Sequence, residues 1–345
     1  MNERKKLFRK SKTKKKLKTN ILLPKFNVLI TICFIFAILI FVLFIIVFVV
    51  IKKNNAKINV DVINQSKTKI KVALCTIAKK ENRYIKYFVE IYKKLGYDHI
   101  YFFDNNEIGD ESIDDVQIVK DGIKEGYISI INYKDKKPNI GTVTQSYYDC
   151  YERYGLEYDW ISFFDIDEYL ILEPKGGSTI QEFLENPRLN ECDNIKFNWR
   201  VFNDNDQLDF EDKPLMERFP KETNYTYENR HVKSTVRGKL DFKKFQRNYS
   251  PHSIWSNLKT CSSSGKRTDG PSPFLWPPDT EFASLNHYVT KSVREFFTKK
   301  YKTKVDVDTI PKATKDYLFN YFFTVNKKTQ EKLNIFNQIY HTNYK

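Results

Sequence analysis

The sequence lacks the short motifs that mark several common kinds of site. Its five cysteines include no Cys-x-x-Cys pair, and none stands at the His spacing of a zinc site. No glycine-rich, Lys/Arg-bearing phosphate loop follows the first strand-like run, because residues 78–82 read AKKEN. These absences argue against a zinc domain and against a nucleotidyltransferase. Cys75, Cys150, Cys192 and Cys261 fit core thiols and disulfides equally well, so both readings stay open.

Acidic residues are nearly absent from the first 57 residues, which contain 14 Lys and Arg but a single acid, Glu3. The rest of the chain is nearly balanced, with 44 basic and 42 acidic residues. A protein that reads nucleic acid needs its basic surface on the folded part. The net charge of +15 therefore does not indicate a nucleic-acid partner, and we expect none.

One uncharged run of 24 residues, Val28 to Ile51, is present. As a helix it exceeds the ~30 Å hydrocarbon core of a bilayer, and it is longer than the apolar core of a cleaved signal peptide. Residues 1–26 contain 11 Lys and Arg, whereas the other flank offers Lys52, Lys53 and Lys57. The positive-inside bias predicts a single-pass type II protein: a cytosolic basic tail (1–27), a signal-anchor helix (28–51) and a polar stem (52–69).

Residues 70–345 form the predicted catalytic domain, where short apolar runs alternate with amphipathic ones. Strands are predicted at 70–77, 99–103, 127–133 and 160–164, with helices at 81–95 and 144–154. Less regular strands follow at 194–202, 230–236 and 285–289, then a loop at 271–278 and a helix from Ala313. This pattern predicts an α/β fold with a mostly parallel, Rossmann-like sheet flanked by helices.

Two of the predicted strands end in polar clusters. Asp165 and Asp167 lie on one side of an extended chain, and their mutual repulsion is relieved by a divalent cation such as Mg²⁺ or Mn²⁺. Asp104-Asn105-Asn106 follows the second strand, where such side chains can accept hydrogen bonds from a nucleoside. Each cluster also fits a plain turn. Ligands bind beyond the carboxyl ends of strands in open α/β sheets, which favours a site here.

Five segments in order resemble glycosyltransferase family 92 and its family 2-like relatives. They are CTIAKKENRYIKYFVEIYKKLGYDHIYFFDNN (75–106), WISFFDIDEYLIL (160–172) preceded by Gln145, FNWRVF (197–202), HVKSTVR (231–237) and NHYVTKSVREFFTKK (286–300). The sequence departs from the family at Lys79-Lys80-Glu81, where Lys-Asn-Glu is common, and at Asn203-Asp204-Asn205-Asp206, where a glycine-containing turn is usual.

The resemblance implies a GT-A fold and an inverting transfer from a nucleotide sugar, in particular a UDP-sugar, to a glycan, glycoprotein or glycolipid. It implies Asp165 and Asp167 as ligands of Mn²⁺ or Mg²⁺ and Asp104 as a nucleoside contact, with Asn105 and Glu81 beside it. His287 matches a family motif and is the candidate third metal ligand or pyrophosphate contact, with His252 as its rival. Lys233 and Lys291 are candidate phosphate partners.

The general base is sought among three carboxylates that follow the strand expected to border the acceptor: Asp204, Asp206 and Glu217. Glu217 fits an ion pair with Arg218 as well. Nucleotide sugars are supplied to the eukaryotic secretory lumen, so a Golgi-type membrane is expected. Asn64 and Asn224 would then be possible glycan acceptors. The remaining alternative is a membrane-anchored protein that binds sugar or nucleotide without turnover.

Overall fold

The structure is a computed structural model that describes residues 22–66, 69–223, 227–299 and 310–345. It divides into two compact units, Met1–Thr68 and Lys69–Lys345, each described by itself below. The predicted basic tail up to residue 21 and the Asn224 acceptor sequence lie outside the described residues.

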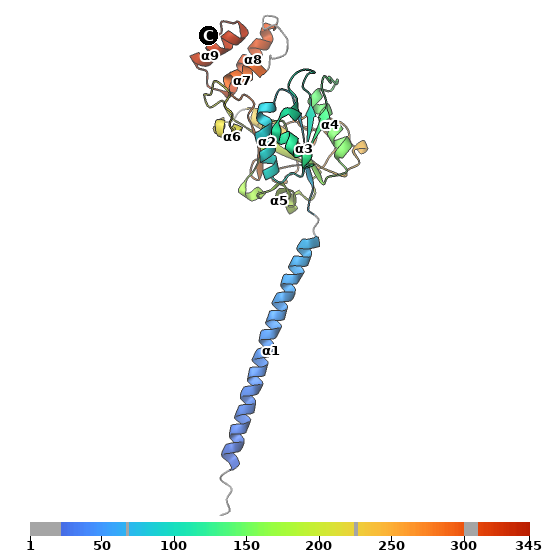
Figure 1. Cartoon of the computed structure of the whole chain (residues 1–345), viewed down its shortest axis with the longest axis vertical. Helices are drawn as coiled ribbons and strands as arrows, with labels where there is room; N and C mark the ends of the chain where they lie inside the picture. Colours follow the sequence, from blue (N-terminus) through green and yellow to red (C-terminus); the bar gives the residue numbers. More distant parts are fainter. Residues whose placement is uncertain (1–21, 67–68, 224–226, 300–309) are drawn as a thin grey trace, which may run out of the picture. The chain divides into compact units, whose positions relative to one another are not determined.

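The first unit contains one long helix, α1 (Leu22–Ser66), shown in blue in Figure 1. Within the described residues, its segment Ile30–Lys53 is long and apolar enough to cross a membrane, and it overlaps the predicted span. The helix continues through most of the segment predicted as a stem and includes Asn64. No glycine or proline stands between Lys52 and Ser66, so no residue there terminates the helix.

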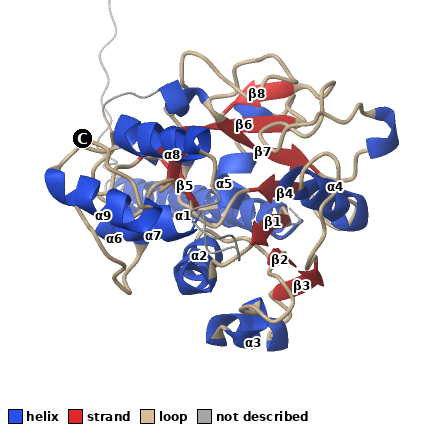
Figure 2. Cartoon of the chain, turned by 90° about the horizontal axis from the view of Figure 1, so that it is seen from above, coloured by secondary structure: helices blue, strands red, loops and turns tan. Residues whose placement is uncertain are grey.

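The second unit is built on a mixed sheet, whose strands in the described residues follow the order β3-β2-β1-β4-β7-β6-β9-β5, with β8 beside β6 (Figure 2). The strands are β1 (Val72–Ala78), β2 (His99–Asp104), β3 (Ile128–Asn132), β4 (Trp160–Phe163), β5 (Glu168–Leu172), β6 (Asn194–Val201), β7 (Val232–Arg237), β8 (Thr260–Ser262) and β9 (Ala283–His287). The first four are parallel, and β7 joins β4 in antiparallel orientation. The predicted α/β class is confirmed; β5 and β8 were not predicted.

The α-helices of this unit are α2 (Asn82–Lys94), α3 (Gln117–Lys124), α4 (Thr142–Tyr154), α5 (Ile180–Leu184), α6 (Leu215–Arg218), α7 (Val293–Lys299), α8 (Lys312–Val325) and α9 (Gln330–Tyr340). Short 3₁₀ turns cover Ile113–Asp115, Pro174–Gly176, Pro187–Leu189, Tyr227–Arg230 and Phe242–Lys244. Predicted helices 81–95 and 144–154 and the C-terminal helix are therefore confirmed within two residues.

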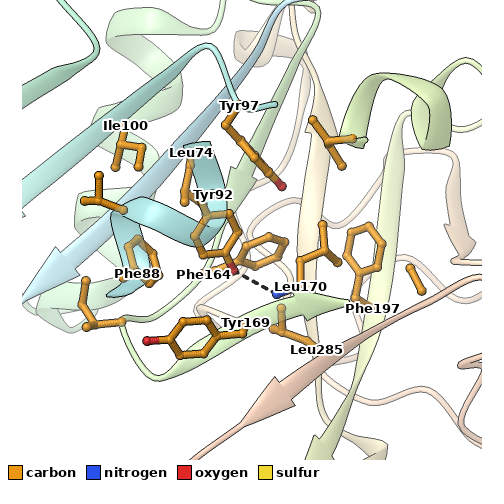
Figure 3. Packing of buried hydrophobic residues seen from close by; sticks show 14 of the residues in the cluster. Leu74, Phe88, Tyr92, Tyr97, Ile100, Phe164, Tyr169, Leu170, Phe197 and Leu285 are labelled. Carbon is orange, nitrogen blue, oxygen red and sulfur yellow. Dashed lines mark hydrogen bonds between the residues drawn. The ribbon is translucent and has the colours of Figure 1, made fainter. Parts of the chain in front are cut away.

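The two faces of the sheet are covered by different helices, because side chains alternate along each strand. Leu74 and Phe102 face α2, whereas Cys75 and Phe103 face α4. Figure 2 shows α2 and α4 on opposite sides of β1. In the α2 layer, Tyr92 lies among Phe88, Phe164 and Leu170 (Figure 3).

The Tyr92 hydroxyl fixes the start of β5. It donates to the Glu168 carbonyl at 2.8 Å and accepts from the Leu170 N–H at 3.2 Å. Tyr92 is fully buried, so these bonds satisfy its polar atom inside an apolar layer. The first residues of β5 are thereby anchored to α2.

Two disulfides settle the cysteine question that the sequence left open. Cys75–Cys150 joins β1 to α4, and Cys192–Cys261 joins the segment before β6 to β8. All four residues are buried, so they belong to the core and are bonded at the same time.

The C-terminal helices form a separate layer with its own core. Aromatic side chains of α7, α8 and α9 pack against one another, among them Phe297, Phe322 and Phe336. Figure 1 shows these helices together in orange and red, close to the C terminus. They extend the unit beyond the sheet and supply one wall of a pocket described below.

Candidate active site

The carboxylates Asp165 and Asp167 lie in a tight turn that joins β4 to β5. The Glu168 N–H donates to the Asp165 carbonyl at 3.0 Å, and the Asp165 N–H donates to the Glu168 carboxylate at 2.9 Å. The expectation of an extended chain is therefore wrong. Ile166 still points into the core, where it is 2% exposed, and both aspartates line the cleft above it.

Asp165 is held by groups from two other elements. The Lys233 ammonium of β7 lies 2.8 Å from its carboxylate, and the Tyr147 hydroxyl of α4 donates to it at 2.6 Å. Burial opposes ionisation, but Lys233 holds the pKa of Asp165 below its usual value. Burial raises the pKa of Tyr147, so the phenol keeps its proton and remains a donor. Asp165 is a fixed anion.

Glu168 completes this cluster and was missed by the sequence analysis. It is fully buried, and its carboxylate lies 3.5 Å from the Lys233 ammonium. Burial raises the pKa of Glu168 to about 8, so it is protonated at neutral pH. Its position directly after the two aspartates was the available signal in the sequence.

Asp167 faces β9 and the residues that follow it. Its carboxylate lies 2.7 Å from the Lys291 ammonium and 3.7 Å from His287 Nε2. The antiparallel β5–β9 pair sets this arrangement, because Glu168 and His287 are partners in its register. Burial lowers the pKa of His287 to about 4, so its ring is neutral. Its Nδ1 is buried and has no hydrogen-bond partner among the described residues.

Two of these residues are of the types that bind a divalent cation. Within the part of the chain that the structure describes, no three His, Cys, Asp or Glu side chains form a ready-made metal site. Each of the two aspartates is instead paired with a lysine: Lys233 with Asp165 and Lys291 with Asp167. A neutral imidazole beside the Asp167 carboxylate nevertheless offers two ligands of suitable type, and Mg²⁺ commonly takes few protein ligands plus phosphate oxygens.

A cleft of about 530 Å³ opens above these groups. Its walls include six residues predicted as binding or metal-ligating, together with Lys79: Glu81, Asn105, Asp165, Asp167, His287 and Lys291. They come from four separate segments of the chain and meet beyond the carboxyl ends of β1, β2 and β4, as the α/β topology predicts. The volume lies in the range of small-molecule sites.

Asp104 and Lys233 were predicted to contact the ligand, and the structure gives them internal partners instead. Asp104 is 3% exposed, accepts from the Asn106 side chain at 2.7 Å and lies 3.4 Å from the Lys134 ammonium. Lys233 is 1% exposed and is held by Asp165 and Glu168. The polar turn after β2 therefore presents Asn105 to the cleft and keeps Asp104 beneath it.

The three carboxylates predicted as general bases do not line the cleft. Asp204 and Asp206 both bind the Lys332 ammonium of α9, each at 2.8 Å, in a turn that anchors the C-terminal helices. Glu217 lies in α6, and its neighbour Arg218 pairs with Glu295 rather than with Glu217. The role of these acids as general base therefore stays a prediction without support from this cleft: Asp204 and Asp206 hold the turn at residues 203–206 against α9, and Glu217 lies in α6.

His252 is placed behind the cleft and does not line it. Its Nδ1 lies 2.9 Å from the Val232 carbonyl, and burial lowers the pKa of its ring to about 3. The ring packs against Trp199 and His231. Between the two rival histidines, the geometry favours His287.

Comparison with known proteins gives one family. The model of the family described as Glycosyltransferase family 92 matches residues 69–339, which is most of the chain. Two solved structures are similar at 11% identity: S. aureus TarS 1-349 (TM-score 0.34, covering 74% of this chain and 71% of TarS) and a galactosyltransferase, LgtC, in complex with donor and acceptor sugar analogs (TM-score 0.29, covering 76% and 99%). No curated protein matches.

Proposed function

Because this chain belongs to glycosyltransferase family 92, we propose that it transfers a sugar from a UDP-sugar, with inversion, to a hydroxyl of a glycan, glycoprotein or glycolipid. The observation that carries the proposal is the meeting of Asp167, His287 and Lys291 in one cleft. A carboxylate and a neutral imidazole can bind a cation, and an ammonium beside them can bind phosphate.

Asp167 and His287 would hold Mn²⁺ or Mg²⁺ in this proposal, and Asp165 would support the same turn. The cation, when bound, stabilises negative charge on the departing diphosphate. Lys291 then exchanges the Asp167 carboxylate for a phosphate oxygen, which its position at the cleft wall permits. Lys79, 40% exposed at the cleft mouth, is a second cation within the same lining.

The nucleoside would occupy the part of the cleft next to β1 and β2, where Ile77 and Asn105 lie. The Asn105 side-chain amide donates to the Tyr133 carbonyl at 2.8 Å, which leaves its amide oxygen to accept from a ribose hydroxyl or a base N–H. Glu81, 6% exposed at the start of α2, borders the same space.

The test is a donor screen of the full chain in detergent, with and without Mn²⁺. We expect Mn²⁺-dependent release of UDP from one UDP-sugar, and a loss of about 100-fold or more in the Asp167→Asn variant. Asp241→Asn, an exposed aspartate paired with Lys244, is the matched control and should behave as the wild type. UDP-sugar binding without any turnover would instead identify a binding protein that has lost catalysis.

The chain is further proposed to be a type II membrane protein of a Golgi-type membrane. The basic residues before α1 favour a cytosolic N terminus. The two disulfides of the second unit fit an oxidising lumen, which also contains nucleotide sugars. In sealed microsomes, added protease should remove the N-terminal tail and leave residues 69–345 intact; digestion of the disulfide-bonded unit would reverse the orientation.

A further inference from the structure

A second pocket of about 450 Å³ adjoins the cleft. The two spaces share His287, Val289 and Phe296 as lining residues, so they adjoin along these side chains. The second pocket lies between Trp199 of β6 and the Tyr227–Arg230 turn on one side and helix α8 on the other. The proposed metal ligand His287 therefore borders both spaces.

The lining of this pocket is aromatic and partly open. Tyr317 and Tyr321 come from α8, and Trp199 comes from β6. Tyr227 and Tyr317 are 59% and 63% exposed, which is unusual for rings that border a pocket of a folded unit. Such rings offer flat apolar faces with polar edges, the surface against which the C–H face of a pyranose packs.

One carboxylate, Glu228, lies in the same lining and next to a histidine. Its Oε2 is 3.0 Å from His231 Nδ1, and the His231 ring is stacked on Trp199 at 4.8 Å. Trp199 in turn packs against His287, at 4.1 Å between ring centroids. A continuous set of rings therefore links Glu228 to the proposed metal ligand.

We propose that the second pocket holds the acceptor, a neutral pyranose at the end of a glycan, and that Glu228 is the general base of the transfer. This inference rests on the proposed function. His231 is a positioning residue, whose Nδ1 is hydrogen-bonded to the Glu228 backbone carbonyl and lies 3.0 Å from the Glu228 carboxylate. The Tyr317 ring supplies the platform for the acceptor ring, and α8 therefore contributes to acceptor choice.

The step balances as a single displacement. The Glu228 carboxylate takes the proton of the acceptor hydroxyl while that oxygen forms a bond to C1 of the donor sugar. The bond from C1 to the phosphate oxygen breaks, and its electron pair leaves with UDP. The products are the glycoside with inverted configuration, UDP and a protonated Glu228, which returns its proton to water.

The experiment uses the full chain in detergent with Mn²⁺, the UDP-sugar selected by the donor screen, and a set of neutral p-nitrophenyl hexopyranosides as acceptors. Glu228→Gln should lower kcat for transfer by about 100-fold or more, with UDP affinity in calorimetry within twofold of the wild type. With Glu228→Ala, added azide should form a glycosyl azide of inverted configuration, because azide has no proton to lose. Glu90→Gln, an exposed residue of α2, is the control.

Acceptor binding is tested separately. Tyr317→Ala should raise KM for the pyranoside by about tenfold and leave KM for the UDP-sugar unchanged. Tyr249→Ala, which changes a side chain that is 78% exposed and outside the pocket, should change neither.

Transfer above a tenth of wild-type activity in Glu228→Gln, or UDP affinity lost in parallel, overturns the base assignment. Wild-type UDP release without transfer to any pyranoside overturns the acceptor class. Failure of the wild type to bind UDP in the presence of Mn²⁺ overturns the proposed function, on which the base assignment and the acceptor class both rest.

Discussion

The Lys233 ammonium lies 2.8 Å from the Asp165 carboxylate, and both belong to a cluster closed off from solvent on the Lys233 side. Lys233→Met should leave Asp165 without its counter-charge and Glu168 without a neighbouring cation. We expect a loss of about 1–3 kcal/mol in the free energy of unfolding, less than for a fully buried pair, because Asp165 is 35% exposed and water can solvate part of its charge. Denaturant unfolding in detergent, followed by tryptophan fluorescence, measures it.

The matched control for that change is Lys239→Met. Lys239 pairs with Asp159 at 2.7 Å but is 57% exposed, so its loss should cost less than about 1 kcal/mol. Equal effects of the two substitutions would contradict the view that burial makes the Lys233 cluster important.

Lys332 is expected to matter for stability and not for transfer. Lys332→Met leaves the buried Asp204 without its cation and should cost about 3–5 kcal/mol, whereas Asp206→Asn should cost little because that side chain is 65% exposed. Both variants should retain sugar transfer below their unfolding temperatures. A 100-fold loss of transfer in Asp206→Asn with unchanged stability would restore Asp206 as the base.

Glu295 gives a predicted pH dependence of stability. It is buried, yet hydrogen bonds from Arg218, Ser292 and Tyr84 lower its pKa to about 2, from 4.5. Because the folded-state pKa is depressed, its contribution is fully present above pH 4.5 and is lost as the pH falls toward 2.

Glu295→Gln should accordingly lower the free energy of unfolding at pH 6 by on the order of 3 kcal/mol and by much less at pH 3. Unfolding curves of the wild type and the variant at both values measure the difference. An equal difference at pH 3 and pH 6 would mean that the Glu295 charge is not responsible.

The Cys75–Cys150 disulfide should stabilise the second unit strongly, since it connects residues 75 positions apart. The double variant Cys75→Ala, Cys150→Ala should lose about 2–5 kcal/mol, because the unfolded chain gains freedom when the cross-link is removed. Cys33→Ala, in the membrane-spanning helix, is the control. Alkylation of Cys75, Cys150, Cys192 and Cys261 in the unreduced, denatured wild type would show that the disulfides do not form.

The predictable part of the fold is the part that local patterns specify. Val72–Ala78 and His99–Asp104 are short apolar runs followed by polar residues, and their ends were placed within two residues. Strand β5 (Glu168–Leu172) was missed because the turn at Asp165 that separates it from β4 contains no glycine or proline. Without such a residue, the sequence did not show where one strand ends and the next begins.

The site divides in the same way. Asp167 and Lys291 were found because a strand end or a family motif marked them, and the fold brings both to one cleft. Asp204 pairs with Lys332, which is 128 positions away, and no local pattern reveals a partner at that separation. Glu228, the base that we propose, carried no signal in the sequence, since its place in one pocket with His287 depends on how α8, β6 and the Tyr227–Arg230 turn come together.

The register of the β5–β9 pair has a consequence for how the site tolerates change. Glu168 opposes His287 and Leu170 opposes Leu285, so the pairing sets which face each side chain occupies. Sliding β9 by one residue would turn the imidazole away from Asp167 and bring a neighbour into its place. An insertion between Cys261 and Ala283 therefore leaves the site intact only if the added residues loop out and the β5–β9 register is unchanged. The length of this stretch thus helps to set the position of His287 opposite Asp167.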